Sequence, residues 1–206
     1  MRSIRDAVTN PDVLADAAVS QRLRSAFKKL NRAMILMWRL GLGPTFEWVP
    51  SITGRVLVVH HTGRRSGNRY RTPLNYAVVD DAVYCLAGFG RVSDWYRNLL
   101  AAGGEAEIWM PKGRWMCTVE EASDHPDRRE LLRAVLRGSG VVAFAFGVPP
   151  TLPDERLDEL TRDYRLIRLT RHSPATGPDR PGDLTWIWAI VAGVWITRRF
   201  VRRRAA

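Results

Sequence analysis

The spacing of apolar residues near the start of the chain is typical of a helix. From Leu23 to Met37, apolar side chains recur every three or four positions, with basic residues between them. This spacing places the apolar side chains on one helix face. Pro11 and the aspartate after it can open a helix, and the glycines and proline of residues 41–44 can end it. We predict a basic amphipathic helix within an N-terminal region, residues 1–44, lying on the protein core or on a membrane surface.

Beyond Pro50 the pattern becomes that of strands, because short runs of β-branched and aromatic residues are separated by turn residues. Asp80-Asp81 is typical of a short hairpin connection. The order of hairpins predicts a mainly β fold with helices (α+β), an antiparallel barrel over residues 45–170. The predicted strands are residues 55–61, 70–79, 82–87, 106–110, 115–121 and 164–170.

Two helices are predicted between these strands. Ser93 can cap the first, over residues 94–102, and the glycine pair that follows can end it. Ser123, followed by a proline and a glutamate, is typical of the start of the second helix, which runs to about Leu136. Both helices are expected to cover the barrel.

The last part of the chain differs from the barrel in composition. Residues 171–183 are rich in proline, glycine and charge, which is typical of a linker. Residues 184–196 are apolar except for Thr185, contain three tryptophans, and precede five arginines. As a helix this run reaches only about 20 Å, less than the roughly 30 Å of a bilayer core. We predict that the tail, residues 184–206, is a membrane anchor. The alternatives are packing on the barrel and pairing of two subunits in a homodimer.

The composition of the chain limits the classes of molecule that it is expected to bind. A chain of 206 residues suits one domain, and its net charge of +11 favours anions: nucleic acid, anionic lipid or an acidic cofactor. Nucleic acid is not expected, because much of the excess charge lies in the tail and in one loop. Cys85 and Cys117 are the only cysteines, which fits a reducing cytoplasm and burial in the core. Without a secretory signal, the expected location is the cytoplasm, and a membrane-anchoring tail would hold the chain at the inner face of the plasma membrane.

Two segments carry candidate chemistry. The first, residues 62–73, lies between two predicted strands and offers glycine N–H groups, the hydroxyls of Ser66 and Thr72 and four guanidinium groups, a set that suits a phosphate or a carboxylate. The same loop could simply be solvated surface. The second, residues 88–98, is a glycine loop that leads into a helix with two aromatic residues, which suits a flat ring ligand or fastens the helix to the barrel. His60 and His61 are adjacent on a strand and face opposite sides, so no metal site is expected.

These segments resemble a known family, the deazaflavin-dependent nitroreductase-like oxidoreductases of the split β-barrel flavin-binding superfamily. The first motif is Thr62-Gly63-Arg64-Arg65-Ser66-Gly67 with Thr72-Pro73-Leu74, and the second is Trp95-Tyr96-Arg97-Asn98-Leu99. Both stand in the order that the family has. The likeness runs from about Asn31 to Glu121 and weakens through Thr170. It departs from the family at Tyr70, where an arginine is common, and in a shorter loop at residues 88–91.

The resemblance implies a split β-barrel that binds the deazaflavin coenzyme F-420, with FMN as the alternative. The implied cofactor-binding residues are Arg64, Arg65, Ser66, Gly67, Arg71, Pro73, Gly88, Trp95 and Asn98. The first four would hold the phosphate and acidic arm, and the ring would lie near Pro73, Gly88 and Asn98.

The implied activity is hydride transfer from reduced F-420 to a small organic acceptor, such as an enone, a quinone-like compound or a lipid-derived compound. Tyr76 is the predicted proton donor, and solvent is the competing source. The alternative function is a membrane-associated protein that binds or carries a flavin, a deazaflavin or haem without turnover.

Overall fold

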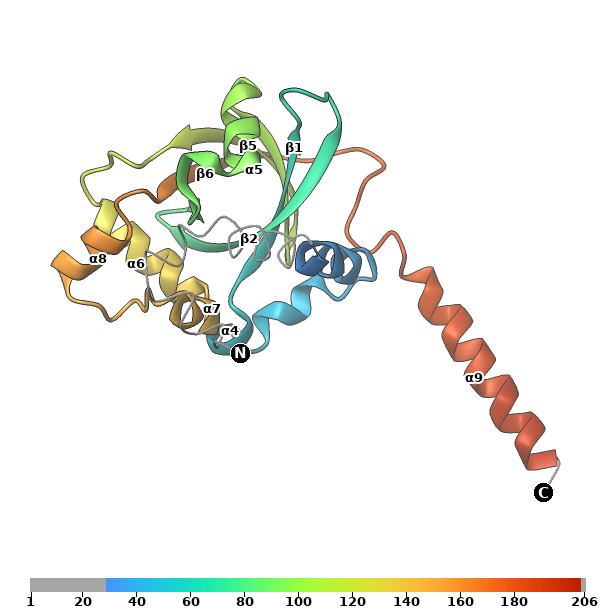
Figure 1. Cartoon of the computed structure of the whole chain (residues 1–206). Helices are drawn as coiled ribbons and strands as arrows, with labels where there is room; N and C mark the ends of the chain where they lie inside the picture. The colour runs from blue at the N-terminus through green and yellow to red at the C-terminus, as the bar shows by residue number, and fades with distance from the viewer. Residues whose placement is uncertain (1–28, 205–206) are drawn as a thin grey trace.

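The computed structural model describes residues 29–204, with side chains described as far as residue 198. Its centre is a closed barrel of antiparallel strands in the order β1-β2-β3-β6-β5-β4 (Figure 1). The strands are β1 (Val56–Thr62), β2 (Arg69–Val79), β3 (Ala82–Ala87), β4 (Glu105–Met110), β5 (Gly113–Glu121) and β6 (Arg165–Pro174). The predicted antiparallel barrel is therefore confirmed.

Alternate residues of each strand fill the barrel. On β1, Leu57 and Val59 are fully buried in a core that also contains Ile108 of β4 and both cysteines. Cys85 and Cys117 are free thiols, as predicted, and act as small apolar side chains. The remaining residues of β1 and β4 point outward, where a second apolar cluster covers the barrel.

The ends of most strands lie within a few residues of the predicted positions, because turn residues separate the strands. Asp80 and Asp81 have φ angles of 48° and 62°, the left-handed geometry of a tight two-residue hairpin. The exception is β6, which continues past Thr170 to Pro174. Its extra residues pair with Trp115 and Met116 of β5, so the predicted linker boundary at residue 171 is wrong.

Helices cover the outside of the barrel: α4 (Pro50–Thr53), α5 (Asp94–Ala101), α6 (Arg128–Gly138), α7 (Val141–Ala145) and α8 (Asp154–Leu160), with the 3-10 turns η1 (Gly43–Glu47) and η2 (Gly90–Val92). The predicted cap at Ser123 is wrong, because α6 begins five residues later, at Arg128. The Ser123 hydroxyl instead donates to Glu121 and accepts the Leu166 N–H, at 2.9 and 3.1 Å, which ties β5 to β6. Ser93 precedes α5 without a side-chain cap bond.

An N-terminal helix packs on the outer face of β1 and β4. Residues 29–39 are helical, and the chain turns at Gly41 with a φ angle of 81°. Trp38 is 1% exposed and packs on Val58 and Trp109. The helix therefore lies on the core, one of the two predicted alternatives, while its predicted start at Pro11 lies outside the described residues.

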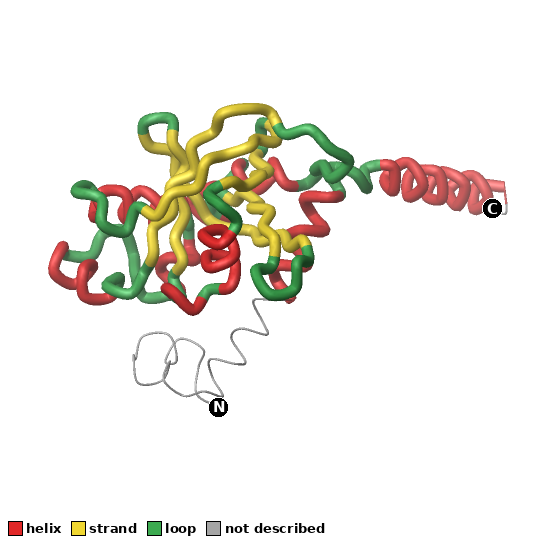
Figure 2. The backbone as a smooth tube through the Cα atoms, turned by 90° about the horizontal axis from the view of Figure 1, so that it is seen from above, coloured by secondary structure: helices red, strands yellow, loops and turns green. Residues whose placement is uncertain are grey.

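The tail forms helix α9 (Trp186–Arg204), which projects from the barrel (Figures 1 and 2). Its base is attached, because the Leu184 N–H donates to Arg39 O and the Trp188 indole donates to Leu40 O, each at 2.9 Å. Up to residue 198, most of the large apolar side chains of α9 are exposed, Trp195 at 60%. Within the described part of the chain, no helix has the length and apolar character needed to cross a bilayer.

Candidate functional site

The loop between β1 and β2 is closed by its own backbone. The N–H groups of Gly63 and Gly67 donate to Asn68 O and Gly63 O, each at 2.8 Å, and the Asn68 N–H donates to the Ser66 hydroxyl. Gly67 adopts a φ angle of 66° with open space where a side chain would stand. The loop therefore presents its arginines and serine on a preformed turn that faces solvent.

Arg64 joins the two predicted motifs. Its backbone N–H and its Nη1 both donate to Asn98 Oδ1, at 3.2 and 2.9 Å, and Nη1 also lies 3.2 Å from Asp94 Oδ1. Asn98 is 4% exposed on the first turns of α5. This contact fixes the loop to α5 and brings Arg64 and Asn98, one residue from each motif, together.

His61 lies behind Asn98 and completes this network. Because Asn98 Oδ1 accepts from Arg64, its Nδ2 donates to His61 Nδ1, at 3.1 Å. The imidazole then carries its proton on Nε2 and donates to the Thr72 hydroxyl, at 2.9 Å. Burial lowers the pKa of His61 to about 4, so the ring is neutral near pH 7. Of the two adjacent histidines, which face opposite sides of β1, His61 is the one that faces the loop cluster.

The other predicted binding residues lie around this network but do not all join it. Trp95 packs against the barrel core and meets Tyr96 edge to face, with ring centroids 6.4 Å apart. The Tyr96 hydroxyl donates to Glu121 at 2.7 Å, and this bond supports the interpretation that the aromatic pair fastens α5 to the barrel. Gly88 lies beside the Tyr164 ring, and Pro73 pairs with Val58.

Tyr76, the predicted proton donor, lies in the barrel core and is 3% exposed. Its hydroxyl donates to the Glu47 carboxylate, and burial together with this bond raises its pKa well above the ordinary value. The structure therefore does not bring Tyr76 to the loop network, and its proton is committed to a structural contact.

The substitution Tyr76→Phe tests that placement. We expect the rate of hydride transfer to stay within about twofold, while the loss of the bond to Glu47 destabilises the fold by about 1 kcal/mol. Turnover and urea unfolding of the variant measure the two effects. A large loss of turnover with unchanged coenzyme affinity would restore Tyr76 as the proton donor.

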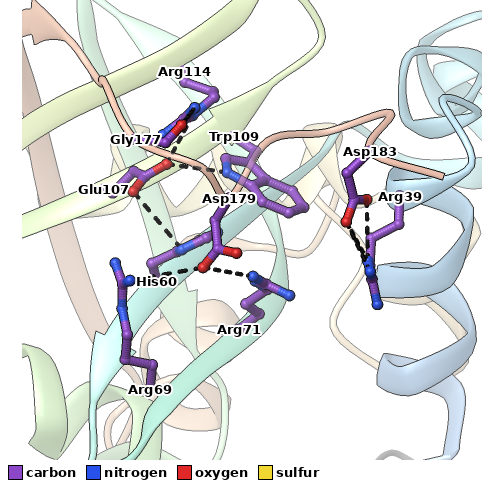
Figure 3. Close-up of polar contacts among 10 residues, drawn as sticks. All are labelled: Arg39, His60, Arg69, Arg71, Glu107, Trp109, Arg114, Gly177, Asp179 and Asp183. Atoms are coloured by element: carbon purple, nitrogen blue, oxygen red, sulfur yellow. Dashed lines mark hydrogen bonds and ion pairs between the residues drawn. The ribbon is translucent and has the colours of Figure 1, made fainter. Parts of the chain in front are cut away.

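Arg71, another predicted ligand, lies on the outer face of the barrel (Figure 3). Its Nη2 is 2.8 Å from the Asp179 carboxylate, and its guanidinium lies 5.1 Å from the centre of the Trp109 ring. Arg69 Nη1 lies 3.7 Å from the same carboxylate. The structure thus places Arg71 on the outer face of the barrel, whereas Arg64 lies on the loop.

Sequence analysis missed the carboxylate beneath this cluster. Glu107 accepts bonds from Arg114 Nε and the Trp109 indole, at 2.9 and 3.2 Å. His60 is 7% exposed, with Nδ1 at 3.9 Å from Glu107 and a buried Nε2 that has no hydrogen-bond partner among the described residues. Burial, with Arg71 nearby, lowers the pKa of His60 to about 3. Residues 29–204 contain no cluster of His, Cys, Asp and Glu able to hold a metal ion.

Solved structures with a related backbone share little sequence with this chain. A putative 5-nitroimidazole antibiotic resistance protein from Bacteroides thetaiotaomicron is 16% identical over 63% of this chain and 79% of its own, with a TM-score of 0.43. HutZ, a haem storage protein from Vibrio cholerae, is 15% identical over 62% of this chain and 87% of its own, at 0.38. An F420-H2 dependent reductase, FDR-A, is 14% identical over 56% of this chain and 93% of its own, at 0.40. No curated protein matches the sequence.

The middle of the chain matches a defined family. The match to the F420H(2)-dependent quinone reductases covers residues 39–142, about half of the chain. It includes the loop, α5 and both members of the Arg64 to Asn98 contact, and it ends before the strand β6 and the tail. The chain therefore belongs to the F420H(2)-dependent quinone reductase family and is an F-420-dependent reductase.

Proposed function

We propose that the loop between β1 and β2 holds the acidic arm of coenzyme F-420, and that the chain reduces a quinone-like acceptor beside it. The observation that carries the proposal is the position of Arg64, which is held by Asn98 and Asp94 at the junction of the two family motifs. Its side chain is 22% exposed, so it is braced and still open to a ligand.

The residues present fit an acidic group. Arg65, Ser66 and Gly67 are exposed on a turn that is closed by its own hydrogen bonds. The nearest carboxylate, Asp94, is 82% exposed and therefore well screened by water. A phosphate would replace water at the loop and pair with guanidinium groups that are already oriented.

The reduced coenzyme, when bound, supplies the hydride. Arg64, Arg65, Ser66 and Gly67 bind its acidic arm, and Asn98 keeps the Arg64 fork in place. Trp95 and Gly88 would border the ring. The Pro73 side chain would not, because it lies on the outer face of the barrel with Arg71, two residues away on β2. Solvent would supply the proton, because the Tyr76 hydroxyl donates to Glu47. Quinone-like, enone and lipid-derived acceptors all suit hydride chemistry, and the family name favours the first.

Side-by-side titration with coenzyme F-420 and FMN tests the proposal, followed by turnover of reduced F-420 with a panel of quinones and enones. We expect binding of F-420 to be tighter than that of FMN, with steady oxidation of the reduced form. Binding without turnover of any acceptor in the panel would instead support the carrier function. Absence of F-420 binding by folded protein would refute the assignment.

The proposal extends to the membrane. Helix α9 carries exposed tryptophans, Trp186 at 58% and Trp195 at 60%, and the sequence places five arginines in its last part, residues 198–204. Indole rings favour the bilayer interface, and arginines favour anionic headgroups. Association with the inner face of the plasma membrane would place the reductase beside lipid-soluble acceptors such as quinones.

Vesicle binding tests the role of α9. We expect the full chain to sediment with vesicles that contain anionic phospholipid. A chain ending at Thr185 should bind these vesicles with an affinity at least about tenfold lower. Ending at Thr185 keeps the bonds of Gly182 and Leu184 to the N-terminal helix. Coenzyme affinity should be equal in both chains, which controls for folding. Equal sedimentation would refute the anchor.

A further inference from the structure

Residues 175–183, here called the strap, cross the outer face of the barrel (Figure 3). They were predicted to be a linker, but both ends are bound to the body. At one end the Ala175 N–H donates to Arg114 O at 3.0 Å, and Arg114 Nη1 donates to Gly177 O at the same distance. At the other end the Gly182 N–H donates to Trp38 O at 2.9 Å. The strap is therefore attached to β5 at one end and to the N-terminal helix at the other.

A bidentate ion pair strengthens the second attachment. Asp183 Oδ1 accepts from Arg39 Nε at 3.1 Å, and Asp183 Oδ2 accepts from Arg39 Nη2 at 2.7 Å. Between the two attached ends, the only ion pairs or side-chain hydrogen bonds that the described residues show between the strap and the sheet are those of Asp179 with Arg71 and Arg69. The middle of the strap thus depends on one carboxylate.

Asp179 lies where an anionic ligand could bind on the outer barrel face. The part of this face that Arg69, Arg71, Trp109 and His60 form is here called the wall. Arg69 and Arg71 lie two residues apart on β2 and point to the same face, so their guanidinium groups converge on a single carboxylate. Trp109 lies beneath Arg71, and the imidazole of His60 meets Trp109 with ring centroids 4.6 Å apart. The wall combines a paired anion site with flat aromatic surfaces.

The wall also contains a polar group that the protein leaves unsatisfied. The His60 side chain is more than nine-tenths buried, and its Nε2 has no hydrogen-bond partner among residues 29–204. Buried polar atoms normally have partners, so an unpartnered nitrogen points to a missing one. His60 pairs with Arg71 across β1 and β2, so this unpaired side chain lies on the same face of the sheet as the contact between Arg71 and Asp179.

We propose that Arg69 and Arg71 form a second anion-binding position on the outer barrel face, which Asp179 occupies until the phosphate or carboxylate of a ligand displaces it. The strap then acts as an internal competitor. This inference rests on the proposed function only for the identity of the ligand, since the acidic arm of F-420 is the anion that the adjoining loop would bring to Arg69. The strap lies outside the range that matches the family.

The exposure of these groups makes the exchange feasible. The Asp179 side chain is 39% exposed and that of Arg69 is 70% exposed, so water screens their attraction. Arg71 is 25% exposed and holds the closer contact. An arm that carries a phosphate together with further acidic groups would attract both guanidinium groups more strongly than one carboxylate does. The attached ends would keep the displaced strap close to the barrel.

Binding measurements on Asp179→Asn test the proposal. We expect F-420 to bind this variant about three- to tenfold more tightly than the wild type, because no internal carboxylate competes. Asp124→Asn is the matched control, since Asp124 is an exposed carboxylate away from the strap and its removal changes the net charge equally. Its affinity should equal that of the wild type. The gain should disappear in the double variant Arg71→Ala with Asp179→Asn.

Hydrogen exchange of the strap gives a second readout, with inorganic pyrophosphate as a probe beside F-420. Ligand should speed exchange of the strap amides in the wild type. Tighter pyrophosphate binding by Asp179→Asn, without any F-420 binding, would support the anion site and refute the proposed function. Equal F-420 affinity of the wild type and Asp179→Asn, with slower or unchanged strap exchange, would overturn the inference and leave the proposed function standing.

Discussion

Replacing Arg64 with alanine is expected to weaken coenzyme F-420 binding by about 1.5–3 kcal/mol, roughly a 10- to 150-fold rise in Kd. Arg64 is the only loop arginine among the described residues that is braced by both Asn98 and Asp94. A braced guanidinium loses little side-chain entropy when it binds an anion, so its removal costs more than removal of a freely moving charge. Calorimetric titration measures the change.

Two variants accompany this measurement. Arg64→Lys keeps the charge but loses the fork that reaches Asn98, so its affinity should fall between that of the wild type and that of Arg64→Ala. Arg162→Ala removes an exposed arginine that precedes β6 and should leave the Kd unchanged. An Arg64→Ala protein that binds F-420 as tightly as the wild type would remove Arg64 from the site.

Acidification is expected to destabilise the fold between about pH 6.5 and pH 4. The pKa of His61 is lowered to about 4 and that of His60 to about 3, both from 6.5. In this window the unfolded chain binds protons that the folded chain excludes, so the free energy of unfolding falls as pH falls. Above pH 6.5 both states are neutral and this dependence vanishes. Between pH 6.5 and pH 4 each histidine contributes at most about 3 kcal/mol, at 1.36 kcal/mol per pKa unit, and the contribution of His60 continues to grow down to about pH 3.

Urea unfolding at several pH values measures this loss, and substitution assigns it. The glutamine of His61→Gln can still donate and accept hydrogen bonds but does not titrate. This variant should therefore lose part of the dependence of the unfolding free energy on pH, and His60 should account for the remainder. Asn98→Asp should act in the opposite direction, because a carboxylate facing His61 Nδ1 favours the protonated ring and raises its pKa. A slope that is identical in the wild type and in His61→Gln would mean that His61 does not titrate in this window.

The same network links stability to function. His61 in its neutral form accepts from Asn98, which leaves the other end of the amide to hold Arg64. Protonation of His61 would oppose this arrangement, since both groups would then be donors. Coenzyme affinity should therefore weaken only as the pH falls toward about 4, where His61 of the folded protein takes up a proton, and it should be constant near neutral pH.

Local pattern determined the barrel and its loop. Alternating apolar positions and turn residues predicted the strands to within a few residues, because each strand buries one face and a shift of one position would expose it. The motifs around Arg64 and Asn98 could be found as well, since a glycine turn rich in arginine has a chemistry that does not depend on distant residues. The contact between them is consistent with the resemblance but required α5 to lie against β1.

Tertiary structure alone decided where several of these side chains act. Nothing near Arg71 in the sequence indicates that Asp179 would cover it, because an ion pair between distant segments leaves no periodic trace. Likewise the burial of Tyr76 against Glu47 depends on η1 reaching the end of the barrel. The strap was predicted to be a linker since proline and glycine suppress regular structure, whereas its order comes from bonds to Arg39, Trp38 and Arg114. Sequence patterns report local conformation and burial, while partnership between distant charges is set only when the chain closes on itself.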